Sequence, residues 1–162
     1  MAADRATVSV SACLLPDEIK TSIGGTTVYD LNDVANNNLW IYSLTLIAAS
    51  AEDLIKDGVN FMGQGAAHEG ATATLKATDD VVFLFVKHTG TTDGSTASTA
   101  TLCINLGAGT PNHASVGDII IEAGECFFAR IAAGGTEIQD LNAISSSGTI
   151  QTQVFAIVDD GG

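Results

Sequence analysis

The residues of this chain that could do chemistry are few and widely spaced. Three histidines, His68, His88 and His113, could ligate a metal ion, but only His68 has an adjacent acid, Glu69. Neighbouring residues of a strand point to opposite faces, so this pair could share one ion only where a loop bends both side chains together. The spacing therefore favours no metal site and no bound cofactor.

Nucleophilic catalysis and phosphate binding have no better support. The chain contains no Gly-x-Ser-x-Gly segment, and Gly107-x-Gly109 is followed by Pro111 rather than by the start of a helix. The cysteines stand far apart in strand-like contexts, without the polar neighbours that stabilise a thiolate; they are Cys13, Cys103 and Cys126. We expect free, buried thiols and a protein that is not an enzyme.

The composition predicts a globular domain with an acidic surface. The 162 residues are 46% hydrophobic and 15% charged, with 19 acids, 6 bases and a net charge of −13. An average soluble domain has about 25% charged residues, so small neutral side chains must cover much of this surface, which favours assembly with other proteins. Nucleic acids and acidic membranes attract basic proteins, so neither is an expected partner.

The start of the chain predicts no targeting segment. Arg5 stands beside Asp4, and serines interrupt the apolar stretch that follows, which is atypical of a signal peptide. Apolar runs stay shorter than the about 18 residues of a membrane-spanning helix. We expect an unprocessed chain made in a reducing cytoplasm.

Hydrophobic residues alternate along most of the chain, which predicts about eight to ten short strands. The predicted strands cover 7–15, 26–29, 39–47, 72–76, 81–88, 100–106, 119–121, 126–132, 137–141 and 149–158. In 39–47 one face collects the residues that we expect to line the core, namely Trp40, Tyr42, Leu44 and Leu46. Both faces of 81–88 are apolar, so this strand should lie in the centre of a sheet.

Two further segments carry distinct local signals. Ser50 to Gly58 has a capping serine, acids in the first turn and a terminating glycine, which predict one short helix. Thr89 to Thr99 consists of turn-forming residues, which predicts an exposed loop. Many strands with one short helix are typical of an all-β fold, an antiparallel β-sandwich of jelly-roll topology. One domain should span residues 1–162, and residues 1–7 could form an extended arm.

The stretch GDIIIEAGE (117–125) resembles the second motif of the cupin enzymes, in which Gly-Asp opens a strand and a metal-binding histidine follows the turn. Here Ala123 stands where that motif has proline, Gly124 comes one position early, and no histidine follows in residues 125–129. The resemblance implies a strand, turn and strand unit of jelly-roll type that lacks the metal ligand.

Candidate interface residues are Arg130 and the run Asn36, Asn37 and Asn38. Arg130 lies inside an apolar run, so its guanidinium needs a partner, either a carboxylate of its own subunit or one of a neighbouring subunit. The three asparagines suit a loop that leads into the next strand and could contact another protein.

The run GDIIIEAGECFFARIAAGG (117–135), the Ala-, Thr- and Gly-rich β pattern and the acidic composition resemble the small head-decoration (cement) proteins of tailed bacteriophages. The resemblance implies a homotrimer that binds the major capsid protein and stabilises the phage head. It also implies localisation on the capsid exterior of the virion, after synthesis in the host cytoplasm. None of the family's binding residues can be carried over to this chain.

Two other functions are alternatives. A receptor-binding or fibre-tip domain would recognise a host glycan or protein with loops such as 89–99, and it would expose aromatic side chains. A divergent cupin-like enzyme would hold a transition metal. Because aromatic residues make up only 6% of the chain and mostly lie in predicted strands, the decoration role is favoured.

Overall fold

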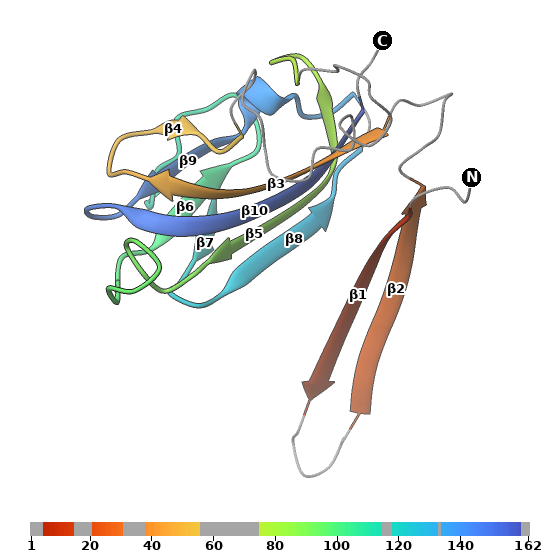
Figure 1. Cartoon of the computed structure of the whole chain (residues 1–162), viewed down its shortest axis with the longest axis horizontal. Helices are drawn as coiled ribbons and strands as arrows, with labels where there is room; N and C mark the ends of the chain where they lie inside the picture. Colours follow the sequence, from red (N-terminus) through yellow and green to blue (C-terminus); the bar gives the residue numbers. More distant parts are fainter. Residues whose placement is uncertain are drawn as a thin grey trace.

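The computed structural model describes residues 5–14, 21–30, 38–55, 75–114, 118–132 and 134–159. Within these ranges the chain is nearly all β (Figure 1). Its strands are β1 (Arg5–Leu14), β2 (Thr21–Asp30), β3 (Asn38–Ile47), β4 (Glu52–Asp53), β5 (Asp80–His88), β6 (Leu102–Asn105), β7 (Ile119–Ile121), β8 (Cys126–Arg130), β9 (Asn142–Ser145) and β10 (Ile150–Asp159).

Strands β3 to β10 form two antiparallel sheets that pack face to face. Their strand orders are β3-β10-β5-β8 and β4-β9-β6-β7. The pairs β3–β10, β4–β9, β5–β8 and β6–β7 are nested within one another along the chain. This nesting, with β10 also beside β5 and β9 beside β6, is the topology of a jelly roll, which confirms the predicted fold.

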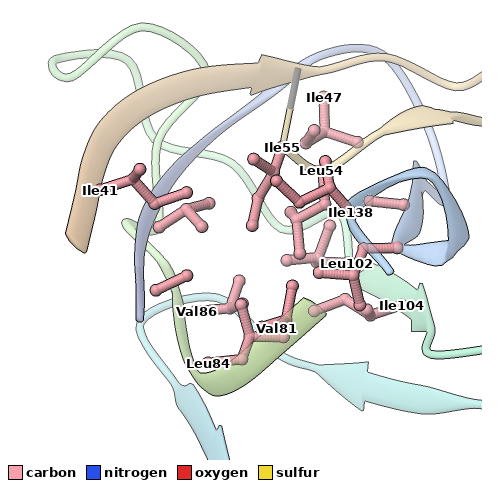
Figure 2. Close-up of a cluster of buried hydrophobic side chains, with 14 of the residues drawn as sticks. Ile41, Ile47, Leu54, Ile55, Val81, Leu84, Val86, Leu102, Ile104 and Ile138 are labelled. Atoms are coloured by element: carbon pink, nitrogen blue, oxygen red, sulfur yellow. The ribbon is translucent and has the colours of Figure 1, made fainter. Parts of the chain in front are cut away.

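The core between the sheets is aliphatic. Its buried side chains come from both sheets and from the segments that connect them, as Figure 2 shows for Ile41, Leu84, Leu102, Ile104 and others. Strand β5 lies between β10 and β8, so the prediction that 81–88 is a central strand is confirmed. Val81, Leu84 and Val86 of β5 project into the core.

Strand β3 faces the opposite way from the prediction. Ile41 and Ile47 are buried in the core, whereas Leu44 and Leu46 are each 52% exposed. Both faces of β3 carry apolar residues, so local alternation could not decide between them. The register with β10, which sets Ile47 opposite the buried Ile150, fixes the face that turns inward.

The predicted helix over Ser50–Gly58 is wrong for the residues described. Glu52 and Asp53 pair with β9 instead, and the Leu54 amide donates to the Leu141 carbonyl at 2.9 Å. Leu54 and Ile55 are both buried. Sheet pairing and burial of these two side chains outweigh the local capping signals, since tertiary contacts override weak helix propensity.

Two predicted strand boundaries also change. The segment predicted as a strand over 137–141 instead contains a 3-10 turn, Ile138–Asp140, whose Ile138 is buried. The sheet pairing begins just after it, in β9, which the prediction assigned partly to a turn. Leu75 and Lys76, at the end of the predicted strand 72–76, are not in a strand, and 72–74 lie outside the described residues.

The hairpin of β1 and β2 lies outside the jelly roll and forms a sheet of its own. In Figure 1 it extends beyond the sandwich and points away from it. Arg5–Thr7, part of the predicted arm, are the first residues of β1, and residues 1–4 are outside the described ranges.

Candidate functional site

The outer face of the β3-β10-β5-β8 sheet is rich in aromatic side chains. Four of the chain's six phenylalanines, Phe83, Phe85, Phe128 and Phe155, line the surface of this sheet that turns away from the core. The Phe83 and Phe155 rings stand 6.1 Å apart, edge to face. A solvent-facing side of an antiparallel sheet is normally polar, so this face has the composition of a binding surface.

The β1–β2 hairpin forms one wall of a groove over this face. The groove has a volume of about 520 Å³, and it lies between β1, from Thr7 to Ser11, and the rings of Phe85, Phe128 and Phe155. The Tyr29 ring of β2 packs 5.4 Å from that of Phe83, and both rings line a second pocket of about 450 Å³ that shares Val8, Val10 and Phe128 with the groove. The hairpin side of the groove carries Val8 and Val10 between the hydroxyl residues Thr7, Ser9 and Ser11, whereas the sheet side is aromatic.

The groove and its sheet carry little net charge. Strands β3, β5, β8 and β10 contain two acids, Asp80 and Asp159, and two bases, Lys87 and Arg130, whereas the whole chain has a net charge of −13. The acidity of the molecule is therefore concentrated outside this sheet. A neutral apolar face is where another acidic protein can approach without strong repulsion.

The predicted interface residues are only partly brought to this surface. Arg130 is exposed on β8, opposite Phe83 in the strand register, and it lines the second pocket, which adjoins the groove at Phe83 and Phe128. Arg130 forms no salt bridge with any of the described residues. The first alternative, a carboxylate partner in its own subunit, is therefore not found among them. Asn38 begins β3 opposite Asp159, and Asn36 and Asn37 lie outside the described residues.

The histidines do not converge. His88 is fully buried at the end of β5, His113 is partly buried in the loop before β7, and His68 with Glu69 lies outside the described residues. Among the side chains that the structure places, no group of three or more His, Cys, Asp or Glu residues could hold a metal ion.

His88 has a structural role that its sequence context did not reveal. Its Nδ1 accepts a hydrogen bond from the Gly90 amide at 2.9 Å, so its Nε2 carries the proton and donates to the Ala100 carbonyl at 2.8 Å. The ring therefore joins the two ends of the loop predicted over 89–99. A histidine between an apolar strand and a turn-rich loop is the sequence signal for this role.

Within that loop, Asp93 holds the backbone in place. Its carboxylate accepts from the amides of Thr96 at 2.7 Å and Ser95 at 2.9 Å, and these bonds lower its pKa to about 2. The tip, residues 93–97, is exposed as predicted. The loop is thus a defined surface feature built by an acid and two hydroxyl residues.

Asp118, from the cupin-like stretch, is engaged in holding a loop. Its carboxylate accepts from the Asn112 amide and from the Asn105 side-chain amide, each at 2.7 Å, and these bonds lower its pKa. Asn105 in turn accepts from the Gly107 amide at 2.8 Å. The arrangement fixes the loop that follows β6, which gives Asp118 a structural role.

The cysteines differ in environment. Cys103 is fully buried, as predicted, and burial together with the nearby Asp118 carboxylate raises its pKa to about 11. Cys126 lies exposed at the start of β8 beside the groove, so the prediction of a buried thiol is wrong there. Its side chain faces outward because it shares a strand face with Phe128 and Arg130.

This contrast predicts selective thiol reactivity. In the folded protein at pH 7.5, iodoacetamide should modify Cys126 at least about 100-fold faster than Cys103, because only the thiolate reacts and the buried thiol stays protonated. Peptide mass spectrometry over a time course gives the two rates. In urea both sites should react at similar rates, and comparable rates in the folded protein would contradict the placement of Cys103.

Comparisons with known proteins give no identification. No family model, curated protein or solved structure matches the chain. None of the described segments forms an apolar helix of membrane-spanning length.

Proposed function

We propose that this protein is a structural protein of a tailed bacteriophage, a decoration protein that assembles as a homotrimer and binds the major capsid protein on the outer surface of the head. The observation that carries the proposal is the jelly roll with an aromatic, nearly neutral outer sheet face. Jelly rolls recur in viral capsid proteins, and an apolar face of this kind is suited to binding proteins.

The physical properties of the chain fit a capsid fastener. A net charge of −13 keeps free subunits soluble and apart from packaged DNA. Loops 89–99 and 105–112 are held by internal hydrogen bonds, so the sandwich offers preformed surfaces that lose little conformational entropy on docking.

Cosedimentation with purified phage heads tests the proposal. The protein should pellet with expanded heads in a saturable manner, at a fixed ratio to the capsid protein. It should remain in the supernatant with buffer alone and with isolated tails. Binding to tails and not to heads would contradict the decoration role.

A second candidate function is favoured by one specific observation. The groove at Phe85, Phe128 and Phe155 falls within the about 300–1,000 Å³ range of ligand sites, and aromatic rings are typical of carbohydrate sites. A receptor-binding or fibre-tip domain would use it to hold a host glycan. Saturable glycan binding that Phe128→Ala abolishes, together with binding to tails, would establish this alternative.

A further inference from the structure

We infer that the outer face of the β3-β10-β5-β8 sheet is the binding site for the β1–β2 hairpin of a second copy of this chain, so that neighbouring subunits exchange hairpins. The inference rests on the self-association included in the proposed function, and it does not depend on binding to a capsid. It identifies the two surfaces that meet, the hairpin and the aromatic sheet face.

The hairpin needs a surface to pack against. A two-stranded hairpin by itself is at best marginally stable in water. Here ten residue pairs run from the Arg5–Asp30 end towards the tip, and the aromatic contact with the sandwich, Tyr29 to Phe83, lies near the Arg5–Asp30 end. Further towards the tip Val10 is 37% exposed, and Val28, nearer the Arg5–Asp30 end and on the other face of the hairpin, is 53% exposed.

The subunit's own hairpin leaves the sheet face open. It buries Phe83, but Phe85 and Phe155 remain partly exposed and Phe128 is 40% exposed. In Figure 1 strands β1 and β2 diverge from the sandwich along their length and point away from it. Each subunit therefore has two partly exposed apolar surfaces, the hairpin and the outer sheet face. The hairpin of one copy can bury its apolar residues against the sheet face of another copy.

The low charge of the hairpin favours a second copy as the occupant. The two described strands contain one base, Arg5, and one acid, Asp30, opposite each other in the register, and residues 5–30 as a whole have a net charge of −1 against −13 for the chain, so the hairpin repels another subunit only weakly. A ten-residue hairpin is about 33 Å long and about 10 Å wide, or about 330 Å² per face. Giving one hairpin and receiving one buries about 660 Å² per subunit, which in a trimer is divided between two neighbours, so each hairpin contact is smaller than a standard interface of about 800 Å² per partner.

Two matched pairs of variants test the inference in the full-length protein. Val10→Asp places a charge on the groove side of β1, and Val28→Asp places the same charge on the other face of the hairpin, at a residue that is 53% exposed and does not line the groove. Phe128→Asp alters the proposed docking face, and Ile120→Asp alters a residue of similar exposure, 41%, on the opposite sheet. Sedimentation velocity over a concentration series gives the self-association constant of each.

We expect Val10→Asp and Phe128→Asp to weaken self-association at least about tenfold, because each buries an unpaired charge at the contact, and the two controls to change it less than about threefold. Circular dichroism establishes that each variant retains the β fold. Mixing Val10→Asp with Phe128→Lys should restore association between the two variants, since the hairpin of one then meets a complementary charge on the sheet of the other.

The outcomes separate this inference from the proposed function. Self-association that is unaffected by Val10→Asp and Phe128→Asp would overturn the hairpin exchange and leave the homotrimer standing. A monomer at every concentration would overturn both the exchange and the proposed self-association, while head binding remains measurable. Loss of head binding in Phe128→Asp with self-association intact would overturn the inference by assigning the face to the capsid.

Discussion

Replacing His88 with leucine is expected to lower the free energy of unfolding by about 2–4 kcal/mol. Leucine is similar in size to histidine, but it cannot form the hydrogen bonds to the Gly90 amide and the Ala100 carbonyl. A buried polar group that loses its partner costs about 1–3 kcal/mol. Gly90 is partly exposed, so water can replace histidine as the partner of its amide. The expected loss of unfolding free energy is therefore smaller than the sum of the penalties for two fully buried groups without partners.

His113→Leu is the matched control for His88→Leu. His113 is only partly buried, it makes one hydrogen bond, to the Thr101 hydroxyl at 3.2 Å, and its Nε2 atom has no partner among the described residues. Its loss should cost less than about 1 kcal/mol. Urea unfolding followed by circular dichroism measures both variants, and equal losses would show that His88 does not hold the 89–99 loop in the way described.

Replacing Ile121 with alanine should destabilise the fold by about 2–4 kcal/mol, since large-to-small changes in a packed core cost about 2–5 kcal/mol. Ile121 is 2% exposed and belongs to the core cluster, where it lies opposite Leu102 in the β6–β7 register. Its strand is at the edge of the sheet, so neighbouring side chains can relax into part of the space. The loss of unfolding free energy should therefore stay below the upper limit of about 5 kcal/mol for such changes.

Ile120→Ala provides the control for Ile121→Ala within the same strand. Ile120 is the preceding residue, has the same side chain and points to the solvent side. Its replacement should cost less than about 1 kcal/mol, through β propensity and a small loss of burial. Chemical unfolding of both variants measures the difference, and a larger effect at Ile120 would mean that the register of β7 is wrong.

Much of the fold could be predicted from local pattern. The alternation in 7–14, the two-sided apolar run 81–88 and the glycine- and serine-rich breaks indicate short antiparallel strands in a sandwich, and the strand orders confirm a jelly roll. The segment Ser50–Gly58 shows where such reasoning fails. Its caps are local signals worth about 1 kcal/mol, whereas burial of Leu54 and Ile55 contributes about 1.5–3 kcal/mol each.

The candidate surface was less predictable than the fold. Leu44 and Leu46 were expected in the core and are exposed, and Phe128 turns outward from β8. Arg130 could be singled out as a charge within an apolar run, and it does line the second pocket, which adjoins the groove. The groove itself could not be foreseen, because β1 and the rings that it faces on β5, β8 and β10 are distant in sequence.

By itself, the sequence determined the all-β class, the central position of residues 81–88 and the acidity of the chain, because these depend on residue type and on a period of two along the chain. The tertiary structure alone decided which face of each apolar strand is buried. A strand with apolar residues on both sides has no local preference, so pairing with its neighbours settles the choice. That choice left the phenylalanines outside, under a hairpin that does not cover them.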